Sequence, residues 1–310
     1  MNYTKNLAHK VFITAFVLLS YTGFCQEKRE KLRLFIIGNS FSINASKFLP
    51  QLAKEGGHDL EIGRAELGGC PLERHWSIAE AYEANPNDPD GKAYNGKSLK
   101  MLLSNGRWDV VTIQQYSRFS GFIDTYRPYA KKLYDYIKSI QPDAKIVIHQ
   151  TWAYRSDAKN FGLVGRDIQA QTDKEMYEKS RAAYHTIADK LNVEIIPTGD
   201  AFYSITSDPA WAFKKDTKFD YAKPVYPATP ADVYSLHAGY KWDKDKKLVF
   251  DPNHASVAGE YLGSLVWYQF LFNQSPKNLN FKPEQVPEKF AKQLKKVAAS
   301  AVSKFKMLYE

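Results

Sequence analysis

Two short segments, far apart in the chain, carry residue types that could together attack an ester. Residues 38–42 (Gly-Asn-Ser-Phe-Ser) follow an apolar run, and residues 251–254 (Asp-Pro-Asn-His) precede an apolar helix. A serine hydroxyl becomes a nucleophile when a neutral imidazole takes its proton, and a carboxylate on the other ring nitrogen fixes the imidazole tautomer. Ser40, His254 and Asp251 therefore predict a hydrolase with a Ser-His-Asp mechanism.

The spacing of Asp251 and His254 has two interpretations. On a turn that enters a helix, residues three apart bring their side chains to one side, which suits an acid and base that work together. Alternatively, Asp251 caps the following helix and His254 is an ordinary residue at the helix start. The spacing alone leaves both interpretations open.

An acyl-transfer site also needs hydrogen-bond donors for the oxyanion that develops on the substrate. The backbone N–H of Ser40 is one candidate if Ser40 opens a helix. Glycine lets the chain approach a ligand closely, so Gly68 or Gly69 could supply a second N–H. The side-chain amide of Gln114 or Gln115 could supply a third. The alternatives are a simple turn at the glycines and solvated glutamines at a strand end.

Short runs rich in Val and Ile predict five buried strands, at Leu32–Ile37, Leu60–Leu67, Asp109–Gln114, Ala144–His149 and Val193–Ile196. Helical patterns fall between them, at Ala45–Gly56, Gly96–Asn105, Asp124–Ile140 and Thr172–Leu191. Strands that alternate with helices predict an α/β fold with a mostly parallel sheet covered on both faces. The carboxyl ends of such strands face one rim, where active sites lie. Ser40, Gly68, Gln114 and Trp152 each follow a strand and should meet there.

Two regions depart from the alternation of strands and helices. Residues 200–250 hold many aromatic residues and prolines with little periodicity, which predicts a lid or a substrate-wall insertion. After Gln274, a Pro-rich link leads to an amphipathic helix at about Glu288–Leu308, whose apolar stripe we expect to pack on the domain. Its stripe is formed by Phe290, Leu294, Val297, Ala301, Phe305 and Leu308.

The first 25 residues have the pattern of an export signal. Lys5 and Lys10 precede an apolar run, Val11–Phe24, which is too short to span a bilayer comfortably. We therefore expect residues 1–25 to be removed and the protein to be periplasmic or extracellular. A lipid anchor is disfavoured because Phe24 is a poor residue before a lipoprotein cysteine. We expect no membrane span in the rest of the chain.

Charge and cysteine content narrow the range of partners. Removal of the two signal lysines lowers the formal net charge from +9 to +7, and this excess is spread along the chain. It could steer an anionic polymer, but a solvated basic surface is the simpler interpretation and no nucleic-acid motif is present.

Without Cys25, Cys70 is the only thiol, so no internal disulfide can form. The loop at residues 84–90 has too few ligands for calcium, and we expect no metal.

These segments resemble the sequence blocks of SGNH (GDSL-like) hydrolases. Residues 38–42 look like the first block, residues 251–254 look like the final Asp-x-x-His block, and Gly68-Gly69-Cys70 falls at the second-block glycine. Residues 113–117 (Ile-Gln-Gln-Tyr-Ser) stand where the third block, usually Gly-x-Asn-Asp, belongs. The likeness is greatest to an exported bacterial branch with a Gly-Asn-Ser first block. It covers about residues 32–272.

The resemblance implies a flavodoxin-like three-layer α/β/α sandwich with a five-stranded parallel sheet in the order 2-1-3-4-5. It implies Ser40 as nucleophile, His254 as base and Asp251 as its orienter. Gly69 and one glutamine would complete the oxyanion hole, and no cofactor would be needed. The domain plan is then a signal peptide at 1–25, a hydrolase domain at 26–274 that contains the 200–250 insertion, and a C-terminal linker and helix at 275–310.

The resemblance also implies ester hydrolysis, often the removal of acetyl groups from carbohydrates. Arg74, His75, Trp152, Tyr154 and Arg155 lie just after strand ends and are candidates to contact a sugar or a uronate. For each of them, use at the surface or in packing is the simpler interpretation. Two other functions stay open. The missing third-block asparagine would suit a glycan-binding protein that has lost the chemistry, and the aromatic insertion would suit a lipid esterase or thioesterase.

Overall fold

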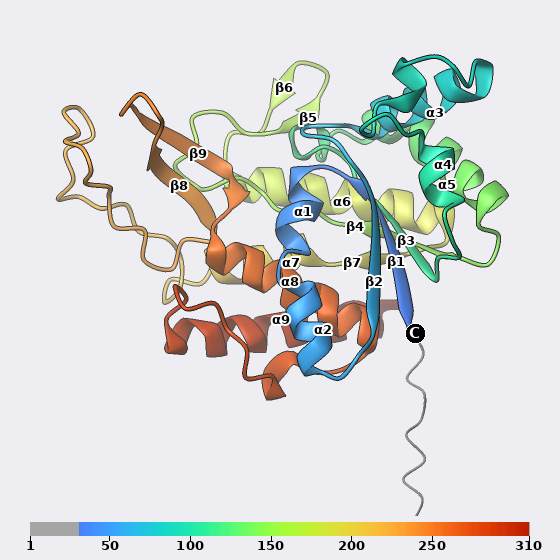
Figure 1. Cartoon of the computed structure of the whole chain (residues 1–310). Helices are drawn as coiled ribbons and strands as arrows, with labels where there is room; N and C mark the ends of the chain where they lie inside the picture. The colour runs from blue at the N-terminus through green and yellow to red at the C-terminus, as the bar shows by residue number, and fades with distance from the viewer. Residues whose placement is uncertain (1–30, 310) are drawn as a thin grey trace, which may run out of the picture.

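The computed structural model describes residues 31–309, so the predicted signal peptide, with Cys25, lies outside the described residues. Five strands pair in parallel in the order β2-β1-β3-β4-β7 (Figure 1). Their bounds are β1 Leu32–Gly38, β2 Leu60–Glu66, β3 Val110–Ile113, β4 Lys145–His149 and β7 Glu194–Ile196. The predicted α/β fold and its 2-1-3-4-5 order are confirmed.

Two hydrophobic cores lie on opposite faces of the sheet because successive side chains of a strand point to opposite sides. In β1, Leu34 and Ile36 enter one core, whereas Phe35 and Ile37 enter the other. The first core is covered by α1 Ser40–Ala45, α2 Leu49–Glu55, α7 Thr198–Thr206, α8 Val257–Phe272 and α9 Glu288–Tyr309. The second is covered by α3 Leu72–Ala84, α4 Leu99–Leu103, α5 Tyr129–Ile140 and most of α6 Asp173–Leu191.

Two predicted helices are shorter than the sequence pattern indicated. The helix expected at 45–56 is two helices, because α1 ends at Ala45 and α2 begins at Leu49 with Pro50 in its first turn. The helix expected from Asp124 begins only at Tyr129, directly after Pro128. Proline fits the first turn of a helix but breaks a helix interior, which explains both boundaries. Helix α3 had no predicted counterpart, since its buried face includes a histidine.

Two antiparallel hairpins stand outside the main sheet. One pairs β5 Leu163–Gly165 with β6 Ile168–Gln169, and the other pairs β8 His237–Trp242 with β9 Leu248–Ala255. The β8–β9 hairpin and the irregular residues 207–236 form the arm that projects from the body at the left of Figure 1. The insertion predicted at 200–250 therefore contains the end of α7, the irregular segment and most of this hairpin. Its role as a lid stays a prediction.

The C-terminal helix packs on the body. Phe290, Leu294, Val297 and Ala301 of α9 are buried in the first core beside α8, as their predicted stripe indicated. The side chains of residues 304–309, and with them Phe305 and Leu308, are outside the description. None of the helices within residues 31–309 is long and apolar enough to cross a membrane.

Replacing Leu265 by alanine should lower the free energy of unfolding by about 3 kcal/mol, because the fully buried side chain in α8 would leave a cavity. Urea unfolding followed by circular dichroism measures this change. As a control, Ile168→Ala removes a side chain that is 60% exposed and should change the free energy by less than about 0.5 kcal/mol. Equal effects of the two substitutions would contradict a tightly packed core around α8.

Candidate active site

Ser40 lies at an abrupt turn from strand β1 into helix α1. Gly38 ends the strand, and a Cβ atom there would lie 2.4 Å from Ser42 Oγ, so only glycine fits this turn. Asn39 caps α1 by accepting a hydrogen bond from the Phe41 N–H at 3.1 Å. Ser40 is therefore the first helical residue, with its hydroxyl at the carboxyl edge of the sheet.

Asp251 and His254 lie on strand β9, and not on a turn that enters a helix as the spacing suggested. In a regular strand, residues three apart point to opposite faces. The β8–β9 pairing is irregular here, because Gly239 pairs with Asp251 while His237 pairs with Ala255. The extra residues on β9 bulge the strand and bring both side chains to one side. The helix-cap interpretation of Asp251 is also wrong, because Ser256 caps α8.

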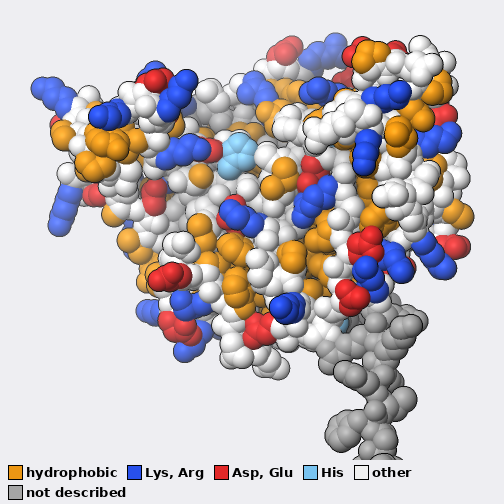
Figure 2. Space-filling model, viewed as in Figure 1, with side chains coloured by type: hydrophobic (Ala, Val, Ile, Leu, Met, Phe, Trp, Pro, Cys, Tyr) orange, Lys and Arg blue, Asp and Glu red, His pale blue; other side chains and the backbone are white. Residues whose placement is uncertain are grey.

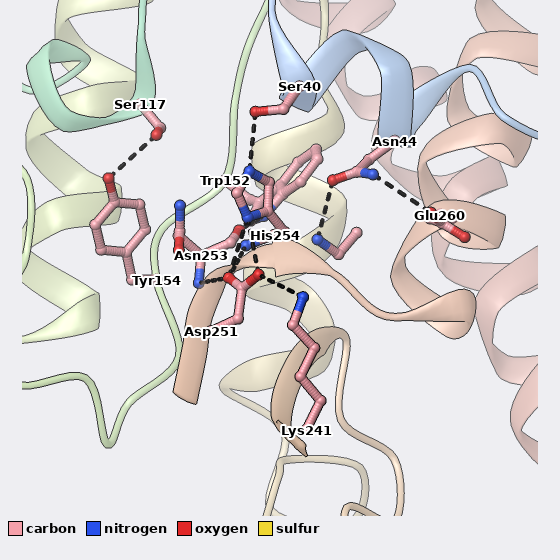
Figure 3. Close-up of polar contacts among 11 residues, drawn as sticks. Ser40, Asn44, Ser117, Trp152, Tyr154, Lys241, Asp251, Asn253, His254 and Glu260 are labelled. Carbon is pink, nitrogen blue, oxygen red and sulfur yellow. Dashed lines mark hydrogen bonds and ion pairs between the residues drawn. The ribbon is translucent and has the colours of Figure 1, made fainter. Parts of the chain in front are cut away.

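The structure brings the three predicted catalytic side chains into one hydrogen-bonded chain (Figure 3). Ser40 Oγ lies 3.0 Å from His254 Nε2, and His254 Nδ1 lies 3.0 Å from Asp251 Oδ2. A carboxylate only accepts, so Nδ1 carries the proton and Nε2 accepts from the Ser40 hydroxyl. The imidazole thus has the tautomer that a general base requires.

The electrostatics of Asp251 suit its predicted role. Burial favours a higher pKa for this carboxyl group, but hydrogen bonds from the His254 side chain and from the backbone N–H groups of His254 and Asn253 lower the pKa to about 2. The Asp251 side chain is 18% exposed and the His254 side chain 38% exposed. Asp251 is therefore ionised near neutral pH, and the imidazole beside it is open to a substrate.

Further contacts hold β9 against α1. Asn44 Oδ1 accepts from the Ala255 N–H at 3.2 Å, and the Asn44 amide donates to Glu260 at the start of α8 (Figure 3). Lys47, in the turn after α1, also pairs with Glu260, at 2.9 Å. Sequence reasoning missed Asn44, although its place one turn after Ser40 on the same helix was a usable signal.

Trp152 is buried behind the triad and does not face a substrate, so its predicted role as a substrate contact is wrong. Its side chain is 1% exposed and stacks between the rings of Phe41 and Phe202, with centroids 4.3 and 4.4 Å away. Its indole N–H donates to the Asn253 carbonyl oxygen at 2.9 Å. Trp152 thus links the helix that carries Ser40 to the strand that carries His254.

A buried chain of amides connects the strand ends beneath the site. Asn39 Nδ2 donates to the Cys70 carbonyl oxygen at 3.0 Å, and Asn39 Oδ1 accepts from Gln114 Nε2 at 2.7 Å. Gln114 Oε1 in turn accepts from His149 Nδ1 at 2.8 Å. The chain crosses from the loop after β2, through β1 and β3, to β4. Among the residues that the structure describes, Gln114 Nε2 donates only to Asn39, so its predicted role as an oxyanion donor stays a prediction.

The Gln115 amide is committed elsewhere, which contradicts its predicted role as an oxyanion donor. Its Oε1 accepts from the Leu72 and Tyr116 N–H groups, at 3.1 and 2.8 Å. Its Nε2 donates to the carbonyl and hydroxyl oxygens of Thr125. Gln115 is fully buried and positions the loops that follow β2 and β3.

The backbone N–H groups of Ser40 and Gly69 stay predicted donors to an oxyanion. In residues 31–309, no acceptor is bonded to the N–H of Ser40 or of Gly69. Gly69 has a φ of +60°, a left-handed conformation that favours glycine, so its N–H orientation depends on that residue type. The Tyr116 ring lies 3.8 Å from where a Cβ of Gly69 would stand. Sequence reasoning missed Tyr116, which borders this loop.

The remaining predicted substrate contacts divide by burial. Arg74 is exposed on α3 and stays a candidate. His75 is fully buried, with Nε2 donating to the Gly38 carbonyl oxygen at 3.1 Å and Nδ1 accepting from Tyr94, so a substrate cannot reach it. Tyr154 is 9% exposed and bonds the Ser117 hydroxyl at 3.1 Å (Figure 3), which leaves it little surface for a ligand. For His75 and Tyr154 the predicted role is therefore replaced by packing.

Arg155 is a buried anchor for the arm. Its side chain is 1% exposed, pairs with Asp157 and Asp232, and lies over the Phe250 ring. Its backbone N–H donates to the Pro252 carbonyl oxygen at 2.9 Å. Arg155 therefore ties the irregular part of the arm to β9 between Phe250 and His254.

Comparisons with known proteins agree with the fold. A family model described as "Domain of unknown function (DUF4886)" matches residues 33–220. A DUF4886 family protein from Bacteroides uniformis has 23% identity and a TM-score of 0.68, covering 88% of this chain and 95% of that chain. A candidate GDSL-like lipase from Parabacteroides merdae is more distant, with 13% identity, a TM-score of 0.45 and coverage of 78% and 95%. No curated protein sequence matches significantly.

The buried histidine beneath Ser40 should make stability depend on pH. Burial lowers the pKa of His75 from 6.5 to about 4, against the opposing effect of its bond to Gly38. As pH falls from 6.5 towards 4, the unfolded chain gains a proton that the folded protein does not take up, so stability is lost. Between pH 7.5 and pH 5, His75 alone should cost about 2 kcal/mol of unfolding free energy.

Urea unfolding at the two pH values measures this loss, and His75→Gln is the matched variant. Glutamine can donate to Gly38 and accept from Tyr94 but does not titrate, so its loss over the same interval should be smaller than that of the wild type. Identical losses in both proteins would refute the neutral, buried state of His75.

Proposed function

Because this chain belongs to the DUF4886 family, whose description names no activity, we propose its function from the site: it is a serine esterase of SGNH type. The observation that carries the proposal is the unbroken chain from Ser40 Oγ through His254 to Asp251, with each step at 3.0 Å. The free N–H groups of Ser40 and Gly69 beside this chain supply the second requirement of acyl transfer.

The reaction would proceed through an acyl-enzyme. Ser40 Oγ attacks the ester carbonyl carbon while His254 Nε2 takes the hydroxyl proton, and the N–H groups of Ser40 and Gly69 receive the oxyanion. The tetrahedral intermediate collapses as His254 returns the proton to the departing alcohol. Water then attacks the acyl-enzyme, again giving its proton to His254, and the acid leaves as Ser40 regains its proton. Asp251 stabilises the imidazolium in both halves of the reaction.

The substrate we propose is an acylated carbohydrate, with acetyl as the acyl group. A cavity of about 360 Å³ beside α1 supports a polar carrier, because its lining includes Arg64, Glu66, Asn95 and Lys97. We also propose that the protein is exported to the periplasm or beyond, on the basis of its basic start and short apolar run at residues 1–25. Export would bring the enzyme to extracellular glycans.

Two rival functions each have an observation in their favour. The commitment of Gln115 to Thr125 favours a glycan-binding protein without chemistry, since it removes one expected oxyanion donor. The exposed Val225, Tyr226 and Val233 of the arm favour an esterase for lipid substrates, since apolar surface of this kind can meet an acyl chain.

Replacing Ser40 by alanine should reduce kcat/KM for p-nitrophenyl acetate by a factor on the order of 10³ or more, because the nucleophile is lost. The same variant should resist a fluorophosphonate probe that labels the wild-type serine. Ser77→Ala is the matched control, since Ser77 is an exposed serine on α3. Activity and labelling that survive in Ser40→Ala would remove Ser40 from the mechanism. A wild-type protein that neither hydrolyses esters nor reacts with the probe would favour the glycan-binding rival.

Acyl-chain preference separates the two esterase hypotheses. With p-nitrophenyl esters of two, four, eight and twelve carbons, kcat/KM should be greatest for acetate, because the proposed acyl group is small. Acetate release from acetylated oligosaccharides, measured by an enzyme-coupled assay, should accompany this preference. Rates that rise with chain length would instead support the lipid esterase.

A further inference from the structure

The cavity beside α1, whose lining is part polar and part apolar, lies on the β2 side of the helix that carries Ser40. Ile43 lines the cavity. Ser40 precedes Ile43 by three residues in α1, so the two side chains lie on the same face of the helix. Leu67 also lines it and directly precedes the Gly68-Gly69 loop. With about 360 Å³, the cavity falls within the usual range of ligand pockets. Whatever is joined to an ester at Ser40 can therefore extend into it.

The acidic residue in this cavity is already neutralised. Glu66 has a 6% exposed side chain and bonds Arg64 at 2.9 Å and the Ser42 hydroxyl at 2.6 Å. The Arg64 guanidinium also donates to Ser46 Oγ at 3.0 Å, so it is held against Glu66 and α1. The Arg64–Glu66 pair thus adds little net charge to the cavity, and the other charged residue of its lining sets the sign.

That residue is Lys97, whose ammonium group is exposed at the rim. It lies on a tight turn closed by two backbone hydrogen bonds between Tyr94 and Lys97, both 3.1 Å long. The Tyr94 hydroxyl donates to His75 at 2.7 Å, and His75 bonds the Gly38 carbonyl oxygen, two residues before Ser40. The turn that carries Lys97 is therefore anchored to the same strand end as the nucleophile.

Two further cations lie around the same loops. Arg74 is exposed on the first turn of α3 and directly precedes His75, whose ring bonds Tyr94 in the cavity wall at 2.7 Å. Arg118 is exposed and follows Tyr116, which borders Gly69. Among residues 31–309, none of Lys97, Arg74 and Arg118 forms an ion pair. Figure 2 shows Lys and Arg side chains on both sides of the hollow in the face that carries α1.

We propose that the cavity beside Ser40 binds the carboxylate of a uronic acid, so that the ester carrier is an anionic glycan. This inference rests on the proposed esterase function and specifies its substrate class. Lys97 attracts a carboxylate as a point charge, and Arg74 can hold one through two parallel hydrogen bonds. The net positive charge of the chain would steer such a polymer towards the site. A neutral carrier would leave these cations without a role in binding.

Binding can be tested separately from catalysis with the Ser40→Ala protein. Titration calorimetry compares a deacetylated galacturonic acid oligomer with a neutral glucose oligomer of equal length, at low salt and at 0.3 M salt. We expect at least tenfold tighter binding of the galacturonate oligomer, with most of the advantage lost at high salt. Equal affinity for the two oligomers would overturn the inference.

Lys97→Gln and Arg74→Gln, each in the Ser40→Ala background, should weaken galacturonate binding several-fold and leave the neutral oligomer unaffected. Lys190→Gln is the control, since Lys190 is exposed in the last turn of α6, at the opposite edge of the sheet. Galacturonate binding that is unchanged in both site variants would overturn the proposed cavity. A sulfated glucose oligomer that binds more tightly than galacturonate would overturn the carboxylate assignment.

Hydrolysis of p-nitrophenyl acetate by the wild type keeps the two proposals apart. This small ester carries no glycan, so its hydrolysis reports the esterase independently of galacturonate binding, and its rate should be the same in Lys190→Gln and in the wild type. Active protein without galacturonate preference would refute the inference and retain the esterase. Galacturonate binding through Lys97 in a protein that hydrolyses no ester would retain the anionic site and refute the esterase.

Discussion

The meeting of helix α1 with strand β9 is the constraint on which the site depends. The hydroxyl comes from the first residue of a helix near the start of the described chain, and the imidazole comes from a hairpin more than two hundred residues later. One hydrogen bond of 3.0 Å joins them directly, and Asn44 joins the same two elements through the backbone of Ala255. Glu260 extends the contact into α8 by pairing with Lys47. A shift of α1 along β9 would break all of these contacts together.

Buried polar groups hold the loops beneath this contact. Unpaired polar groups are costly to bury, so the bonds of Asn39, Gln114 and Gln115 fix the positions of the strand ends that they connect. His75 acts in the same way at the end of β1, where its ring bonds the Gly38 carbonyl oxygen. Asn39, Gln115 and His75 are fully buried and support the site from inside the fold. They set the directions in which the hydroxyl of Ser40 and the N–H of Gly69 point.

The sequence was sufficient for the sheet and for the three residues of the proposed triad. Apolar runs located β1, β3, β4 and β7, because buried parallel strands leave a continuous apolar pattern, whereas the edge strand β2 contains Glu61, Arg64 and Glu66. The sequence was insufficient where tertiary contacts determine the direction or the burial of a side chain. The bulge that aligns Asp251 with His254 depends on the pairing of β9 with β8, which spacing does not reveal. Likewise, His75 and Trp152 look like ligand contacts in a sequence, and only their neighbours show that they are buried supports.

The position of His254 on the β8–β9 hairpin affects how the protein loses activity on heating or in denaturant. Asp251 and His254 belong to a strand of the arm, and Arg155 couples that strand to Asp232 in the arm's irregular, largely exposed segment. Segments with few buried contacts open at lower free energy than a sheet core. Heat or denaturant should therefore loosen the arm first. The contact of His254 with Ser40 would then be lost while the five central strands are still intact. Inactivation would then precede denaturation, and the melting temperature of the core would overstate the working range of the protein.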